Sequence, residues 1–251
     1  PTNNNSDGDG YYDHEEKLIG YSSFGDYGSD WYIDGRFWYW PTGTNYLGVP
    51  VIQTSAQKKY EFYYSDNLLT GWWLAETEVP GSDDSMIWYD FGGDGRPNPR
   101  QVNRNYTAGL AEDPDHDGLS SAYEVLYFYE MHGVYMSPDM PDSNTNGIID
   151  GDEDFDSDGL SNSQEYNSPA NTNYDECRHG SSSPFAIDSD NDGVCDGPTV
   201  PGPYIGVTNG PDHFPVDPAG WRDTDCDGKP DELSQAHAST SYPPLEEDLD
   251  D

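Results

Sequence analysis

The sequence has few basic residues and lacks any long apolar run. Lys and Arg number only 10 among 251 residues, against 49 Asp and Glu, so the formal net charge is −39. Nucleic acids and anionic membrane surfaces are both bound through Lys and Arg, so we expect neither as a partner. No apolar run approaches the roughly 18 residues that cross a bilayer, so no membrane span is expected.

Cysteine is scarce and catalytic motifs are lacking. Cys177, Cys195 and Cys226 permit either one disulfide with one thiol left over or three free thiols, and no CxxC pair indicates a zinc or redox site. The six His are scattered, and the sequence contains no HExxH, no GxSxG and no glycine-rich phosphate loop. The sequence therefore predicts a protein that is not an enzyme.

Charge and aromatic residues divide the chain into two regions. Residues 1–110 contain 16 acidic and 7 basic residues, whereas residues 111–251 contain 33 acidic and 3 basic residues. All Trp residues except Trp221 lie in the first region. We expect four parts: a docking segment with one acidic loop at 1–20, an aromatic-rich domain at 21–110, an acidic array at 111–240 and an acidic tail at 241–251. Residues 243–251 of the tail are expected to be either disordered or a linker.

Short segments separated by turn residues predict antiparallel strands in the first region. Asp34-Gly35 divides two aromatic runs in residues 30–40, which is typical of a hairpin. The short spacing favours a mainly β, sandwich-like domain over a parallel sheet, with further strands at 46–54, 57–65, 71–79 and 85–90. The aromatic side chains form either its core or a face that binds glycan or a neighbouring subunit. Trp38 and Trp40 fall on the face opposite Phe37 and Tyr39, so one pair is expected to point away from the sheet's own core.

Acidic residues recur at alternate positions before a glycine, once near residue 5 and repeatedly in the second region. A calcium loop of 12 residues uses oxygen side chains at positions 1, 3 and 5, glycine at position 6, a carbonyl at position 7 and a bidentate Glu at position 12. Ca²⁺ is a hard cation, and alternate residues of a tight loop point inward to supply its six to eight oxygens. Mg²⁺ is less suited because it demands stricter geometry. The pattern therefore predicts several Ca²⁺ sites.

Four segments contain all of these features, and four copies argue against ordinary acidic turns. Their predicted side-chain ligands are Asn5, Asp7, Asp9 and Glu16; Asp113, Asp115, Asp117 and Glu124; Asp142, Asn144, Asn146 and Glu153; and Asp154, Asp156, Asp158 and Glu165. Their predicted carbonyl ligands are those of Tyr11, Leu119, Ile148 and Leu160.

Two more segments match through position 9 only. Their predicted ligands are Asp188, Asp190, Asp192, the Val194 carbonyl and Asp196, and Asp223, Asp225, Asp227, the Lys229 carbonyl and Asp231. Thr199 and Ser234 occupy position 12, so the last ligand must come from elsewhere, with Asp196, Asp231 or Glu232 as nearby candidates. A seventh segment, residues 90–101, keeps Asp90, Asp94 and Gly95 but lacks acids at positions 3 and 12.

The tandem acidic loops at about 111–235 resemble thrombospondin type 3 repeats of secreted bacterial proteins. The loops at Asp142 and Asp154 abut, which leaves no room for the paired helices of an EF-hand sensor. Phe214, Pro215, Asp217 and Pro218 precede the loop at Asp223, as a Phe-Pro-x-Asp-Pro linker precedes such loops. The resemblance implies an irregular array of calcium loops in which bound Ca²⁺ ions form part of the core. The sequence departs from it in the missing position-12 acids and in an insert at 166–187. Residues 120–131 separately have the apolar spacing of a helix.

These features favour a secreted or cell-surface structural protein. We expect a self-assembling subunit of an extracellular fibre, surface layer or adhesin, since the loop at Asn5 can dock on the array of a neighbouring copy. Loops of this kind suit extracellular calcium, and Asn4 and Asn105 begin glycosylation triplets. Adaptation to high salt explains the charge but not the spacing of the acids. The alternative function is a non-catalytic glycan-binding module of a polysaccharide-degrading enzyme, with a platform formed by Trp31, Trp38, Trp40, Trp72 and Trp73.

Overall fold

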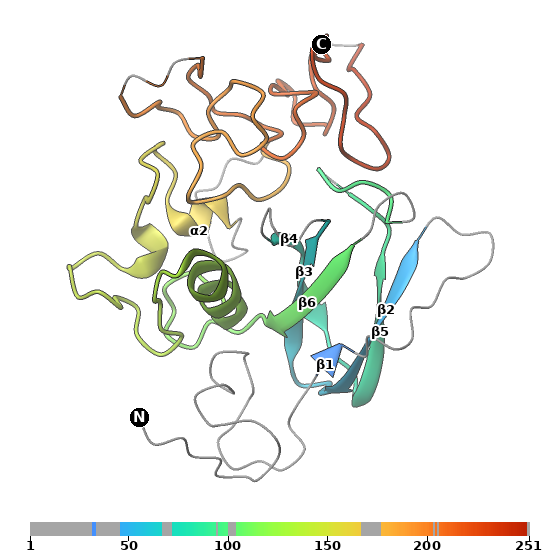
Figure 1. Ribbon diagram of the computed structural model, residues 1–251, viewed down its shortest axis with the longest axis vertical. Coiled ribbons are helices and arrows are strands. Elements are labelled where there is room, and N and C mark those ends of the chain that lie inside the picture. Colours follow the sequence, from blue (N-terminus) through green and yellow to red (C-terminus); the bar gives the residue numbers. More distant parts are fainter. Residues whose placement is uncertain are drawn as a thin grey trace. The chain divides into compact units, whose positions relative to one another are not determined.

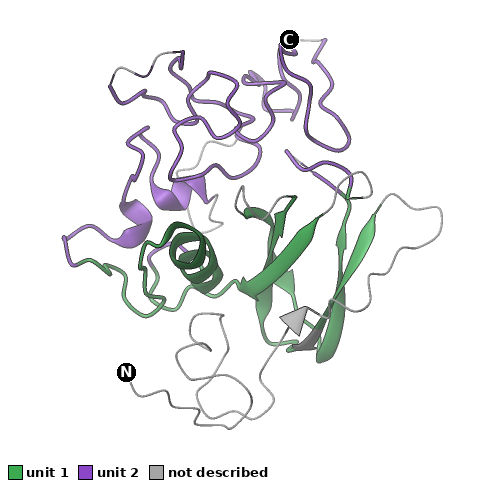
Figure 2. Cartoon of the chain, in the orientation of Figure 1, with its two compact units in different colours: residues 1–91, 99–116, 120–144 green, residues 92–98, 117–119, 145–251 purple. Residues whose placement is uncertain are grey.

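A computed structural model of the chain is mostly β, with two antiparallel sheets and few helices (Figure 1). The chain forms two compact units (Figure 2). The β unit comprises residues 1–91, 99–116 and 120–144, and the loop unit comprises residues 92–98, 117–119 and 145–251. The structure describes residues 46–66, 72–93, 95–99, 104–166, 177–202, 204 and 206–249, and the backbone of residues 32–33.

The described residues of the β unit form two three-stranded antiparallel sheets. β1 (Tyr32–Ile33), β2 (Leu47–Thr54) and β5 (Asp84–Asp90) lie in the order β1-β2-β5. β4 (Trp73–Pro80), β3 (Lys59–Ser65) and β6 (Asn105–Leu110) lie in the order β4-β3-β6. The strands predicted at 46–54, 57–65, 71–79 and 85–90 are confirmed, whereas the sequence pattern does not predict β6. Of the hairpin predicted at 30–40, only β1 lies among the described residues.

Side chains from both sheets form one buried core cluster. Trp88 stacks on Phe62 with ring centroids 4.5 Å apart, and its indole N–H donates to the Glu76 carboxylate over 2.6 Å. These aromatic residues therefore serve the core, the first of the two roles considered for them. The cluster comprises Leu47, Val49, Val51, Tyr60, Phe62, Trp88, Ala108 and Leu110.

The predicted helix at 120–131 is present as a π-helix, η1 (Tyr123–Met131). It follows a turn that packs on β6, where a Cβ on Gly109 would lie 2.4 Å from the Ala122 Cβ. Glu61 on β3 is fully buried, and its carboxylate accepts hydrogen bonds from the hydroxyls of Tyr63, Thr77 and Ser120. Because three hydroxyls satisfy it, Glu61 is a structural acid. Among the described residues, no helix has both the length and the apolar character that a membrane span requires.

Where the structure describes it, the loop unit consists mainly of loops, with two short helices, η2 (Asp150–Asp152) and α2 (Asn162–Glu165). Ser161 caps α2, since its hydroxyl accepts the Gln164 N–H while the Gln164 side chain accepts the Ser161 N–H. Cys177 and Cys226 form a disulfide and Cys195 is a buried thiol, which is the first of the two cysteine arrangements left open by the sequence.

Residues 241–249 pack within the loop unit instead of forming the disordered tail or linker expected from the sequence. The carboxylate of Asp217 accepts hydrogen bonds from the hydroxyls of Ser239 and Ser241 and from the backbone of Thr240. The Asp248 N–H donates to the Pro230 carbonyl over 2.9 Å. The acid of the Phe-Pro-x-Asp-Pro linker thus anchors the C-terminal segment.

Candidate metal centres

Five loops in the described part of the chain share one backbone conformation. A left-handed conformation costs a non-glycine residue about 1–2 kcal/mol and persists only where the surroundings fix it. Position 4 nevertheless has φ between 59° and 66° in His116, Thr145, Ser157, Asn191 and Cys226. Position 6 has φ between 89° and 97° in Gly118, Gly147, Gly159, Gly193 and Gly228. Because five unrelated side chains adopt it at position 4, the frame of the loop sets this conformation.

Side-chain oxygens at positions 1, 3 and 5 form that frame by accepting backbone N–H groups. Position 5 accepts the N–H of position 7 over 2.7–2.9 Å in every loop, through Asp117, Asn146, Asp158, Asp192 and Asp227. Position 3 accepts the N–H of position 5 in the loops at Asp154, Asp188 and Asp223. Such a bond occupies one oxygen of a carboxylate. The other oxygens of Asp156, Asp188 and Asp190 are buried with no hydrogen-bond partner among the described residues, which is the arrangement expected of cation ligands.

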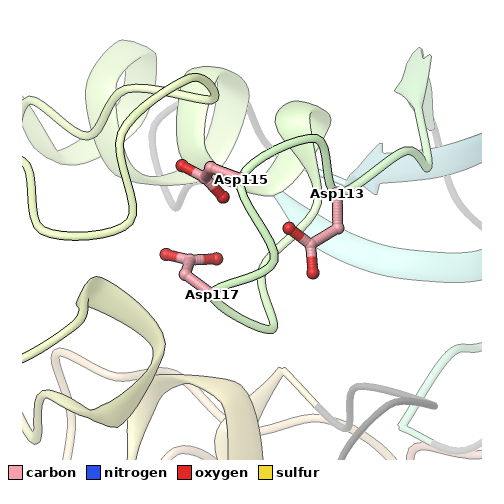
Figure 3. Close-up of side chains that lie close together, drawn as sticks. All are labelled: Asp113, Asp115 and Asp117. Carbon is pink, nitrogen blue, oxygen red and sulfur yellow. The ribbon is translucent and has the colours of Figure 1, made fainter.

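The loop at Asp113 brings its first three acids together (Figure 3). One carboxylate oxygen from each of Asp113, Asp115 and Asp117 lies within 4.8 Å of the others. The His116 N–H donates to Asp113 over 2.7 Å, which closes the turn between the first and fourth residues. Glu124, the predicted position-12 ligand, is fully buried on η1.

The loop at Asp154 belongs to a buried group of acids that combines two loops. Asp154, Asp156 and Asp158 form one close group, and Asp158, Glu165 and Asp196 form another, each with oxygens within 4.8 Å of one another. Asp158, Glu165 and Asp196 are fully buried. Glu165 Oε1 accepts the Ser182 hydroxyl, whereas Oε2 is buried with no hydrogen-bond partner in the described part. Asp196, predicted as a ligand of the loop at Asp188, is thus placed with the neighbouring loop.

Burial and mutual repulsion disfavour the charged forms of these acids. Burial raises the pKa of Asp156 to about 7, and Asp158 adds to the shift. Burial also raises the pKa of Asp196 to about 7 and that of Glu165 well above its ordinary range. The Arg178 guanidinium opposes the shifts of Asp158, Glu165 and Asp196, but one cation does not balance three carboxylates. A divalent cation would complete the charge balance.

The loop at Asp188 is a third acidic group. Oxygens of Asp188, Asp190 and Asp192 lie within 4.8 Å of one another. Burial raises the pKa of Asp190 to about 8, with Asp192 as the next cause. The Asp196 carboxylate of this loop accepts the N–H and hydroxyl of Ser189 at position 2. That bond fixes Asp196 at the edge of its own loop, turned toward Asp158 and Glu165.

The loop at Asp223 differs because basic groups accompany its acids. His179 Nε2 lies 2.9 Å from Asp223 Oδ2, and Lys229 Nζ lies 2.6 Å from Asp227 Oδ2. Burial alone would raise the pKa of Asp223, but hydrogen bonds from His179 and from the N–H groups of Gly228 and Cys226 together lower it below its ordinary value. Asp225 is exposed, and Asp231 accepts the N–H and hydroxyl of Thr224. This loop therefore has the shared backbone conformation, but its carboxylates carry less uncompensated negative charge than those of the loops at Asp154 and Asp188.

The remaining predicted positions differ in their surroundings. Asn146 is exposed and donates to Glu153 over 2.6 Å, and Asn105 is exposed on β6. In the seventh segment Asp90 is fully buried and accepts from Arg104 (2.8 Å) and Tyr106 (2.6 Å), so an ion pair occupies the position of a metal. Asn4, the ligands predicted from Asn5 to Glu16, and Asp94 lie outside the described residues.

Comparison of the chain with protein-family models, with curated proteins and with solved structures finds no match.

Proposed function

We propose that this chain is a calcium-dependent structural protein whose loop unit folds around bound Ca²⁺. The observation that carries the proposal is the group Asp158, Glu165 and Asp196, three fully buried carboxylates with oxygens within 4.8 Å of one another. Three such acids are stable together only with a cation or after protonation. Ca²⁺ fits the donor set best, because every side-chain donor is an oxygen and the loop spacing suits its coordination.

An extracellular location is the second part of the proposal. The disulfide between Cys177 and Cys226 supports it, since disulfides persist in oxidising compartments. Calcium loops of extracellular modules suit the high calcium concentration outside cells. No catalytic role is proposed for the acidic groups.

Chelation tests the calcium dependence. The near-UV circular dichroism and unfolding temperature of the chain are measured in CaCl₂, in MgCl₂ and in EGTA. We expect Ca²⁺ to raise the unfolding temperature strongly, Mg²⁺ to raise it weakly, and EGTA to abolish the near-UV signal of the loop unit. An identical unfolding curve in all three solutions would refute the proposal.

A patch of aromatic side chains on the β unit supports self-assembly, which is the third part. Tyr89 and Phe91 are exposed beside Ile87, and the Tyr46 ring lies 5.4 Å from Tyr89 and 4.9 Å from Phe91 between centroids. Tyr89 points away from the core that its neighbour Trp88 enters. Exposed aromatic clusters of this kind are typical of surfaces that contact a partner.

Light scattering after size exclusion tests the patch. We expect the wild-type chain to form dimers or larger species in CaCl₂, and the double variant Tyr89→Ser and Phe91→Ser to remain monomeric. Tyr204→Ser removes an exposed aromatic ring from the loop unit and serves as the matched control. A wild-type monomer in CaCl₂ that binds a polysaccharide on a glycan array would favour the glycan-binding function instead.

A further inference from the structure

In the loop at Asp188, a residue far along the chain occupies the place of position 12. In the loops at Asp113 and Asp154, the position-12 Glu donates its backbone N–H to the carbonyl of position 8, Glu124 to Ser120 over 3.0 Å and Glu165 to Ser161 over 2.9 Å. Position 8 of the loop at Asp188 is Cys195, and its carbonyl accepts the N–H of Asp212 over 3.1 Å. Asp212 is therefore the structural equivalent of the two position-12 acids.

The chain returns to this place along a short parallel segment. Thr208 pairs with Val194, donating to the Gly193 carbonyl over 2.8 Å and accepting from the Cys195 N–H over 3.0 Å. Gly210 then passes so close that an added Cβ would lie 1.9 Å from the Cys195 carbonyl oxygen. The segment 208–212 thus places Asp212 beside position 8 of the loop at Asp188, as α2 places Glu165 beside position 8 of the loop at Asp154.

The Asp212 side chain has the environment of a ligand. It is fully buried, and its Oδ1 accepts the Phe214 N–H over 2.8 Å. Its Oδ2 is buried with no hydrogen-bond partner in the described part of the chain, as are Asp188 Oδ1 and Asp190 Oδ2. Burial raises the pKa of Asp212 to about 10, so a buried charge at this position needs a cation beside it.

The other candidates for the last ligand are engaged elsewhere. Thr199, at position 12 in the sequence, donates its hydroxyl and its N–H to the Asp158 carbonyl over 2.8 and 2.9 Å. Asp196 lies with Asp158 and Glu165. These contacts leave Asp212, whose backbone is bonded to position 8 of the loop at Asp188, as the candidate for the last ligand.

We propose that Asp212 is the final carboxylate ligand of a Ca²⁺ ion that Asp188, Asp190 and Asp192 hold. The assignment rests on the proposed calcium-binding function. Asp248 makes the equivalent backbone contact with Pro230 in the loop at Asp223, but there His179 and Lys229 already pair with Asp223 and Asp227.

Native mass spectrometry of the full chain in a calcium-containing buffer tests the assignment by counting bound ions. Asp212→Asn is expected to lose one Ca²⁺, and Asp190→Asn is expected to lose one as well. The double variant Asp190→Asn/Asp212→Asn should lose no more than either single variant, because both residues serve the same ion. Asp158→Asn/Asp212→Asn should lose more than either of its single variants. Glu247→Gln removes an equal charge at an exposed position and should lose none.

The outcomes separate the assignment from the function on which it rests. A wild-type chain that binds no Ca²⁺ refutes both. A wild-type chain that binds Ca²⁺ while Asp212→Asn keeps every ion makes Asp212 a buried, protonated structural acid and overturns the assignment alone. If Asp212→Asn does not fold, Asp212→Glu keeps the carboxylate, and calcium titration should then show one weakened site; unchanged titration would overturn the assignment.

Discussion

Replacing Glu165 by Gln is predicted to have opposite effects with and without Ca²⁺. Oxygens of Asp158, Glu165 and Asp196 lie within 4.8 Å of one another. At that distance and an effective dielectric constant of about 20, two unit charges repel by about 3.5 kcal/mol, and three pairs by about 10 kcal/mol. This repulsion is as large as the whole stability of a typical domain. The three ionised acids therefore do not remain together without a cation.

Without Ca²⁺ the folded chain relieves the repulsion by protonating Glu165. Burial raises the pKa of Glu165 well above its ordinary value of 4.5, with Asp156 and Asp158 as further causes. The folded state thus binds the proton more tightly than the unfolded state, so stability is highest below pH 4.5 and is lost as pH rises toward the raised pKa. Because Gln resembles the protonated acid and carries no charge, Glu165→Gln should stabilise the calcium-free chain at pH 7 by up to about 3 kcal/mol, the repulsion of one charge pair at this distance, or roughly 10 °C.

With Ca²⁺ the same substitution removes a charged ligand, so the variant should unfold at a lower temperature than the wild type. The assay is thermal unfolding by circular dichroism at pH 7 in EGTA and in CaCl₂. Glu246→Gln, at an exposed position, is the control and should change neither curve. Equal destabilisation of Glu165→Gln in both solutions would refute the reasoning, because it would mean that Glu165 acts only through packing.

Three further predictions concern other parts of the chain. In the unreduced protein a thiol reagent should find no reactive cysteine in the native state and one in denaturant, because Cys195 is buried and burial raises its pKa to about 12; three thiols would contradict the disulfide. Arg104→Met should destabilise the β unit by about 3–5 kcal/mol in urea unfolding, because it leaves the fully buried Asp90 without its ion pair; an unchanged midpoint would show that the pair contributes nothing. Gly193→Ala should cost about 1–2 kcal/mol in CaCl₂, because its φ is +96°, and an equally stable variant would argue against the shared loop conformation.

Local features of the loops could be predicted because the residues that form them occur at fixed intervals along the sequence. Alternating acids followed by glycine specify side-chain oxygens that accept backbone N–H groups and a left-handed residue at position 6, and all five described loops have this geometry. Four strands and the helix followed from the spacing of apolar and turn residues in the same way. The strand β6 escaped prediction because Asn105 and Gly109 interrupt its apolar pattern.

Contacts between distant segments could not be predicted, because the spacing of residues along the sequence does not indicate which distant segments pack together in the fold. Asp196 has the sequence position of a ligand for its own loop, yet Ser189 holds it toward Asp158 and Glu165. Asp212 lies between the loops at Asp188 and Asp223, outside the 12 positions of either loop, so the loop pattern does not predict it as a ligand. The cue that points to it is structural: its backbone bond to position 8 repeats that of Glu165.

The number of Ca²⁺ ions bound to the folded chain tests the central claim most directly. The chain is purified in CaCl₂, freed of unbound metal, and analysed by native mass spectrometry and by elemental analysis of the same sample. Three loops in the described residues, at Asp113, Asp154 and Asp188, each bring three carboxylates within 4.8 Å. We therefore predict at least three Ca²⁺ ions per chain. A folded chain that carries no Ca²⁺ and unfolds at the same temperature after EGTA treatment would contradict the account.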